Sequence, residues 1–288
     1  MDDRQKGIAL SLGGFVLLST ESLFARAADA AAFDVVFWVG LLSAAATATI
    51  SAVRHRAGPI ALVVRGGWPL VLAAALQGAT VTCFIVAVRT TAISNVVAII
   101  AAAPLAAATL ALVLIGERSA PRVWIAAALS GVGVLAVVGG SLGGGDVRGD
   151  LLAVGAIVAF GCTAVVLRRN PELDGTVVVG LGGAVMAAVA APAATLSHSA
   201  GTWAALVAIG AVVGPTARVM IVSAPRYLPV GEVGLFAPFE TVLASLWAYL
   251  AFDEVPTAAT LVGGAVVLFA ILWATWPRPV GDSAPGRA

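Results

Sequence analysis

The chain has 288 residues, of which 60% are hydrophobic and only 11% are charged, and its formal net charge is +1. A soluble domain carries roughly 25% charged residues, and the mean hydropathy of this chain is +1.04. The composition excludes an ordinary soluble domain and gives no basis for a nucleic-acid partner. It predicts an integral membrane protein whose surroundings are the lipid bilayer.

The apolar residues fall in long blocks, and the few charged residues cluster between them. Each block has about 20 residues, the length that crosses a hydrocarbon core as a helix. The runs are continuous and rich in Ala, Leu and Val, which favours helices over the alternating strands of a barrel. We therefore predict an all-α integral membrane protein with ten transmembrane helices. The expected spans are 7–25, 33–53, 68–88, 92–115, 122–140, 150–167, 176–196, 203–222, 231–252 and 257–276.

The first span has an alternative interpretation as a cleaved signal peptide. Arg4 and Lys6 precede it, and the small-residue stretch at 25–32 follows it. Its apolar run is longer than the roughly 7–15 residues of a signal sequence. We expect a retained helix.

Basic residues set the expected orientation, because Lys and Arg are retained on the cytoplasmic side. With the amino terminus inside, twelve basic residues lie in cytoplasmic connections, while three, Arg26, Arg89 and Arg148, lie outside. The sixteenth, Arg218, lies within a span. Both termini are therefore predicted to be cytoplasmic.

An internal repeat divides the chain. Residues 87–117 align without a gap on residues 224–254, which places Ala103 opposite Glu240. The predicted domains are a first five-helix repeat at 1–140, a linker at 141–149, a second five-helix repeat at 150–278 and a cytoplasmic tail at 279–288. An odd number of helices per half inverts the second half, and inverted repeats of this kind form a binding site near the membrane midplane.

Two motifs of this repeat resemble a known family. A proline-containing helix ends in an acidic residue, from Pro104 to Glu117, and the turn "APRYLPV" lies at 224–230. Both resemble the EamA-type permeases, the ten-helix bacterial members of the drug/metabolite transporter superfamily. The chain departs from the family pattern at Val39, where members often carry arginine, and at Thr241, which aligns with Pro104. For this chain the resemblance therefore implies neither a substrate-anchoring arginine at position 39 nor a kink in the ninth helix at position 241.

Within the superfamily, "APFE" at 237–240 and the Trp-bearing second helix are most similar to the aromatic amino acid exporters. The resemblance implies a secondary transporter that exports small metabolites, aromatic or other neutral amino acids, by alternating access across the bacterial inner membrane. Its expected partners are an amino acid-like substrate and, as a coupling ion, protons. No cofactor is expected, and the oligomeric state is not predicted.

Three charged side chains within the spans are candidates for substrate binding or coupling, because burying a charge in a membrane is costly. Glu240 lies near the middle of the ninth span, where no basic residue is expected at its depth, and poor solvation favours its neutral form. Glu240 either binds a substrate ammonium or a proton, or makes a structural hydrogen bond to a neighbouring helix. Glu21 either binds a substrate ammonium, carries a proton or extends outward to water. Arg218 either contacts a substrate carboxylate or reaches the inner surface.

Uncharged residues complete the predicted pocket. Gln77, Thr80 and Phe84 follow the spacing of one helical face in the third span, which predicts either a shared cavity or interhelical packing. Trp38 and Phe236 are candidates for stacking on a planar substrate.

Two backbone features are also expected to affect the helices. Pro104 is predicted to kink the fourth helix, since it removes a backbone hydrogen bond. Gly210 and Gly214 form a GxxxG pair that predicts close helix packing.

Two other functions compete with amino acid export. Glu21 and Glu240 would also serve as counter-charges in an exporter of cationic drugs or toxic organic cations. Alternatively, "GGSLG" at 139–143 matches the nucleophile pattern of a serine hydrolase, with Ser141 at its centre and His198 expected on the same side. That pattern requires a strand and a sharp turn before a helix, so an enzyme is not expected. Cys83 and Cys162 lie in separate spans and indicate no metal site.

Overall fold

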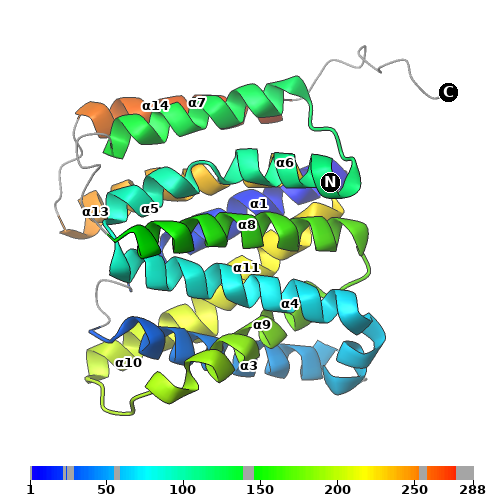
Figure 1. The fold of residues 1–288 in the computed structure, drawn as a ribbon, viewed down its shortest axis with the longest axis vertical. Coiled ribbons are helices and arrows are strands. Elements are labelled where there is room, and N and C mark those ends of the chain that lie inside the picture. The colour runs from blue at the N-terminus through cyan, green and yellow to red at the C-terminus, as the bar shows by residue number, and fades with distance from the viewer. Residues whose placement is uncertain are drawn as a thin grey trace.

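The computed structural model describes residues 2–21, 24, 29–54, 59–138, 146–252 and 258–276. Within these ranges every regular element is a helix (Figure 1). Seven helical stretches among the described residues are long and apolar enough to cross a membrane. The chain is therefore a multi-pass α-helical membrane protein.

The helices follow the order of the apolar blocks. Their bounds are α1 (Asp3–Ser19), α3 (Ala32–Arg54), α4 (Pro59–Thr90), α5 (Ile93–Ile100), α6 (Ala103–Ile115), α7 (Pro121–Val138), α8 (Val147–Arg169), α9 (Gly175–Ala190), η2 (Ala191–Ala193), α10 (Ala200–Val207), η3 (Ala208–Val213), α11 (Gly214–Ser223), η4 (Ala224–Arg226), α12 (Val230–Gly234), α13 (Ala237–Phe252) and α14 (Ala258–Thr275).

Three of the expected spans, 7–25, 122–140 and 231–252, contain helices in their described parts but are not among the seven membrane-length stretches. α1 has 17 residues, the apolar part of α7 covers only Pro121–Ala136, and the ninth span is divided into α12 and α13. The count of ten spans therefore stays a prediction.

Side-chain caps mark where several helices begin. Asp2, Asp146, Asp174 and Ser199 each accept a backbone N–H from the first turn of the helix that follows, in α1, α8, α9 and α10. Such caps satisfy amide groups that a helix start leaves unbonded. Gly116, with φ of 69°, ends α6 in the left-handed conformation that glycine adopts without strain. The starts and ends are thus encoded locally.

α4 begins earlier than the expected third span and bends at its start. Gly67 has φ of 57° and ψ of −155°, and Pro69 follows it, so the residues before Gly67 are not continuous with the long helix after it. The expected span began at residue 68, which matches the start of this long helical part.

The fourth and ninth spans are each broken into two helices, and Pro104 lies at one of these breaks. α5 ends at Ile100 and α6 begins at Ala103, so Pro104 is in the first turn of a new helix, where its missing N–H is not needed. Pro104, which was predicted to kink the fourth helix, therefore lies at the start of a separate helix. α13 begins in the same way, with Pro238 as its second residue. The gapless sequence alignment pairs Pro104 with Thr241, whereas Pro104 and Pro238 occupy the same position in their helices; α12 has 5 residues and α5 has 8.

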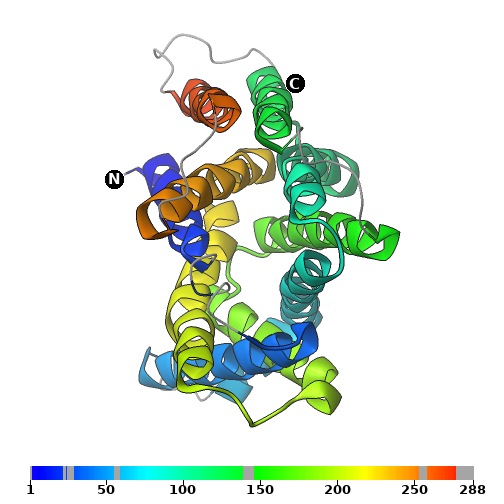
Figure 2. The ribbon, with the colours of Figure 1, turned by 90° about the vertical axis from the view of Figure 1, so that its left-hand side faces the viewer.

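The helix pairs are arranged along the long axis of the molecule. α7 and α14 pack together at one end, and α3 packs with α9 and α10 at the other (Figures 1 and 2). Between them lie the two broken helices, which touch at their breaks: a Cβ atom on Gly234 would lie 3.0 Å from the Cα atom of Pro104. Phe15 and Phe236 are buried in the core beside these breaks.

Candidate functional site

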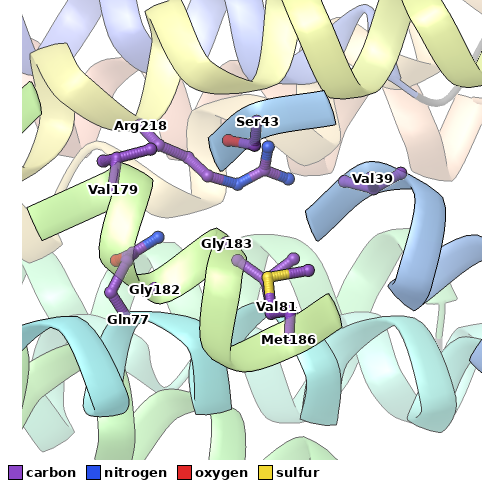
Figure 3. Close-up of a pocket in the computed structure, with 9 residues that line it drawn as sticks. All are labelled: Val39, Ser43, Gln77, Val81, Val179, Gly182, Gly183, Met186 and Arg218. Atoms are coloured by element: carbon purple, nitrogen blue, oxygen red, sulfur yellow. The ribbon is translucent and has the colours of Figure 1, made fainter. Parts of the chain in front are cut away.

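A small cavity lies between α3, α4, α9 and α11 (Figure 3). Its polar lining consists of Ser43, Gln77 and Arg218, which are 4%, 6% and 9% exposed. The remaining lining residues are Val39, Val81, Val179, Gly182, Gly183 and Met186. Arg218 extends into the cavity from α11, and Gln77 points toward it from α4 (Figure 3). The free volume is about 10 Å³, room for about one water molecule. The cavity is closed in this conformation.

Glycines hold the cavity walls close together. A Cβ atom on Gly183 would lie 2.6 Å from the carbonyl oxygen of Gly40 in α3, and one on Gly182 would lie 2.8 Å from that of Ala74 in α4. Backbone carbonyls cannot move aside as side-chain ends do, so any larger residue would separate these helices. Small residues allow this kind of approach between membrane helices.

Arg218 also forms a buried ion pair. Its Nη2 atom lies 3.0 Å from Oε2 of Glu21, just beyond the end of α1, and the two side chains are 10% and 16% exposed. The other oxygen of Glu21, Oε1, is buried and has no hydrogen-bonding partner among the described residues. An unsatisfied buried acceptor costs about 1 to 3 kcal/mol. This oxygen is therefore a candidate acceptor for a proton or a ligand.

Glu240 supplies a second carboxyl group near this pair. It lies in the first turn of α13 and is partly buried. Its charge is repelled by Glu21 and attracted by Arg218. Arg218 is buried and does not reach the surface, so Glu240 has a basic residue in its surroundings that the sequence did not lead us to expect. We call Glu21, Arg218 and Glu240 the charged cluster.

The charged cluster contains two carboxyl groups and one guanidinium group. When all three are ionised, one negative charge is left without a partner within the cluster. The positive end of the α13 dipole offsets part of this charge, because Glu240 lies in the first turn of that helix. A buried excess carboxylate favours uptake of a proton or a cationic group.

Three residues were predicted to lie on one face of α4, namely Gln77, Thr80 and Phe84, and their surroundings differ. Gln77 lines the cavity, as expected for a site residue. The hydroxyl of Thr80 donates to the carbonyl oxygen of Leu76 in its own helix at 2.9 Å. Phe84 packs against apolar residues of α5 and α8. Only Gln77 of the three is brought to the charged side chains.

The aromatic candidates lie away from the cavity. The indole N–H of Trp38 donates to the carbonyl oxygen of Thr195 at 2.9 Å, and its ring lies 4.7 Å from that of Trp203. Phe236 is 2% exposed within the core, and Phe239 packs against the same core. These rings contribute to packing in this conformation and leave the cavity without an aromatic wall.

Sequence reasoning missed Ser43 as a lining residue. Ser43, Thr47 and Ser51 are buried at 4%, 0% and 2% exposure on one face of α3. Their spacing of four residues repeats along a helix that is otherwise apolar, and such spacing places side chains on one face. This polar stripe was the available signal, and it identifies the face of α3 that points inward.

Gln77 also lines a second cavity, together with Phe160 and Thr163 of α8. The hydroxyl of Thr163 donates to the carbonyl oxygen of Ala159 at 2.8 Å, and Thr163 is 2% exposed. Gln77 thus lies between the two cavities. Phe160 and Thr163 were not predicted, since no feature of their spacing distinguishes them.

A separate polar cluster joins the start of α3 to the connection between α9 and α10. Asp34 is 1% exposed, and its carboxylate lies 2.9 Å from Nε2 of His198 and accepts the backbone N–H of Thr195 at 2.8 Å. This gives His198 a structural partner. Ser141, with which the hydrolase interpretation paired it, lies outside the described residues.

A third polar cluster joins the ends of α6 and α8 to the start of α12. Oε2 of Glu117 lies 2.7 Å from Nε of Arg168, and Oε1 accepts the backbone N–H of Val230 at 2.8 Å. Arg168 also donates to the carbonyl oxygen of Pro225 at 3.1 Å. The acidic residue that ends the repeat motif therefore bridges three helices.

No protein-family model and no curated protein sequence matches this chain. Among solved structures, it is similar to one described only as "Crystal structure of protein", with 21% identity and a TM-score of 0.80. The match covers 94% of this chain and 97% of the other. At this identity the likeness supports the fold alone.

Proposed function

We propose that this chain is a secondary transporter of the EamA type, within the drug/metabolite transporter superfamily. In this proposal it exports small metabolites, chiefly aromatic or other neutral amino acids, across the bacterial inner membrane by alternating access. The observation that carries the proposal is the charged cluster, which lies inside a membrane protein where Arg218 extends into a closed cavity. Ionisable residues buried within membrane spans mark substrate and ion pathways by default.

Helix pairing supports the inverted-repeat part of the proposal. α3 packs on α9, α6 on α12 and α7 on α14, and each pair joins corresponding members of the two predicted halves. α4 packs on α8, and α11 packs on α1. In each of these two pairs the third span of one predicted half contacts the first span of the other half. Reciprocal pairing of this kind is expected of two repeats related by a pseudo-two-fold axis, as are broken helices in corresponding positions.

A neutral amino acid carries a carboxylate and an ammonium group, and the charged cluster contains a partner of opposite charge for each. The guanidinium of Arg218 is suited to bind a substrate carboxylate through two hydrogen bonds, and it would then exchange Glu21 for the substrate. Glu240 and the released Glu21 would accept the substrate ammonium. The closed cavity has room for about one water molecule, so binding requires the helices around it to separate.

Export of an organic cation is the second candidate, and one specific observation favours it. The charged cluster has one carboxyl group more than its single guanidinium can balance. A cation would neutralise this excess charge directly, with Arg218 still paired to Glu21. The two candidates therefore differ in whether Arg218 changes partner.

Reconstituted vesicles test the proposal and separate the candidates. Uptake and efflux of aromatic amino acids and of hydrophobic organic cations would be measured with and without a pH gradient. We expect amino acid transport that falls several-fold in Glu240→Gln, which keeps the shape of the side chain and removes its charge. Glu172→Gln, at an exposed position, is the matched control. Movement of cations alone would replace amino acid export with the second candidate, and movement of neither class would refute both.

A further inference from the structure

The Glu21–Arg218 ion pair lies directly over Gly214. Arg218 follows Gly214 by four residues on the same helix, and long side chains in helices lean back over the preceding turn. A Cβ atom at Gly214 would overlap the Nη1 atom of Arg218 and the backbone carbonyl oxygen of Ile209, and it would lie 2.7 Å from Oε1 of Glu21. The ion pair therefore occupies the space that a side chain at this position would fill.

The backbone at Gly214 is also unusual. Gly214 is the first residue of α11 and directly follows the π-helical segment η3, and its N–H donates to the carbonyl oxygen of Ile209. π-helical segments are rare and often occur at functional sites. Here the wider turn ends at the residue over which the ion pair lies.

Gly210, the other member of the predicted GxxxG pair, has a different environment. A Cβ atom there would lie 2.9 Å from the Cβ atom of Leu42 and 3.1 Å from the Cα atom of Val39, both in α3. Gly210 therefore allows close packing of two helices, as the sequence predicted. Gly214 makes room for the two charged side chains in addition to the carbonyl oxygen of Ile209 in η3.

We infer that Gly214 is a positioning residue that holds the Arg218 guanidinium on Glu21 and thereby sets the direction in which Arg218 enters the cavity. A methyl group at position 214 would overlap both the guanidinium and the backbone carbonyl oxygen of Ile209, and of these two the guanidinium is the flexible end that can move aside. Glu21 would then lose the one charged partner that it has among the described residues and take up a proton, since a buried carboxylate without a counter-charge is poorly solvated. The consequence for transport rests on the proposed function, whereas the positioning itself does not.

Carbodiimide labelling tests this inference without any substrate. Carbodiimides modify buried carboxyl groups in their protonated form, and mass spectrometry of the peptide that contains Glu21 measures the yield. We expect labelling of Glu21 to rise several-fold in Gly214→Ala and to stay at the parental level in Gly210→Ala. Arg218→Gln is the positive control and should label as strongly as Gly214→Ala. Parental labelling in Gly214→Ala would overturn the inference.

A second variant separates the ion pair from the backbone. In Arg218→Lys the Nη1 atom is absent, so adding Gly214→Ala should change the labelling of Glu21 much less than Gly214→Ala changes it in the parent. If Gly214→Ala alone fails to fold, the inference requires that the double variant folds. A double variant that also fails would show that Gly214 serves the backbone at Ile209, and the inference would be wrong.

The pH dependence of transport provides the functional readout. If Gly214 acts through Glu21, the pH profile should shift in Gly214→Ala and should not shift further when this change is added to Glu21→Gln. A purely structural effect would lower transport equally at every pH and would add to the effect of Glu21→Gln. If the vesicles transport nothing, the proposed function fails while the labelling result still decides the role of Gly214.

Discussion

Glu117→Ala tests whether one carboxylate holds the ends of α6 and α8 to the start of α12. The substitution removes a hydrogen bond of 2.7 Å from Arg168 and one of 2.8 Å from the Val230 amide. The charged bond contributes about 1.5 to 3 kcal/mol. Its value should be near the low end, because the Arg168 side chain is 31% exposed and solvent screens the pair. The hydrogen bond from the Val230 amide adds about 1 kcal/mol, which gives a total loss of about 2.5 kcal/mol.

Thermal unfolding of the purified protein in detergent measures this loss. A change of about 2.5 kcal/mol corresponds to a fall in apparent Tm of roughly 5 to 10 °C for a chain of this size. Glu117→Gln keeps an acceptor for the Val230 amide and should lose only the contribution of the charged bond, about 1.5 kcal/mol. Glu172→Ala removes an exposed carboxylate and controls for the change in net charge. The scan rate must be fixed, since unfolding of large proteins is often irreversible.

A Tm of Glu117→Ala equal to that of the parent would refute this reasoning. So would a glutamine variant as unstable as the alanine variant, because the charged bond would then account for the whole effect. The double variant with Arg168→Ala isolates the pair: the combined loss should be smaller than the sum of the two single losses.

Three further predictions concern the other clusters and the orientation. Asp34→Ala should lower the apparent Tm by more than Glu117→Ala, because its carboxylate is 1% exposed and its partners would be left buried. Gln77→Ala should reduce transport by about ten-fold, the effect of losing roughly 1.4 kcal/mol of substrate binding, whereas Thr80→Ala should transport like the parent because its hydroxyl bonds its own helix. A reporter fused after Ala288 should be cytoplasmic and one inserted at 141–148 should be external; a cytoplasmic reporter at the second position would contradict the ten-span topology.

The positions of the helices were predictable because apolar runs of membrane length are a strong signal. The members of the charged cluster were also predictable, because a charged residue inside an apolar span is costly and stands out in the sequence. What the sequence did not reveal was the pairing. Arg218 meets Glu21 across two helices that are far apart in the chain, and no spacing rule connects them.

Helical spacing predicted which residues share a helix face, but it did not predict what that face contacts. Gln77, Thr80 and Phe84 share a face of α4, yet the spacing gives no information about which neighbour each residue meets along the helix. The gapless repeat likewise placed Thr241 opposite Pro104, although the two helix starts align Pro104 with Pro238. A repeat in sequence fixes the register only where its helices have equal lengths, and α12 is shorter than α5.

The uneven charge of the charged cluster makes membrane voltage relevant to this protein. In a transporter the cluster would face each side of the membrane in turn, so the voltage would act on whatever ion neutralises it. Moving one elementary charge through the membrane changes the free energy by roughly 2.3 kcal/mol per 100 mV. An organic cation leaving a cell that is negative inside would work against this field, and a proton returning through the same site would cancel the difference. A zwitterion carries no net charge and would be indifferent to it, so under the proposed function the charge balance around Arg218 would affect how steep a gradient each class of substrate could reach.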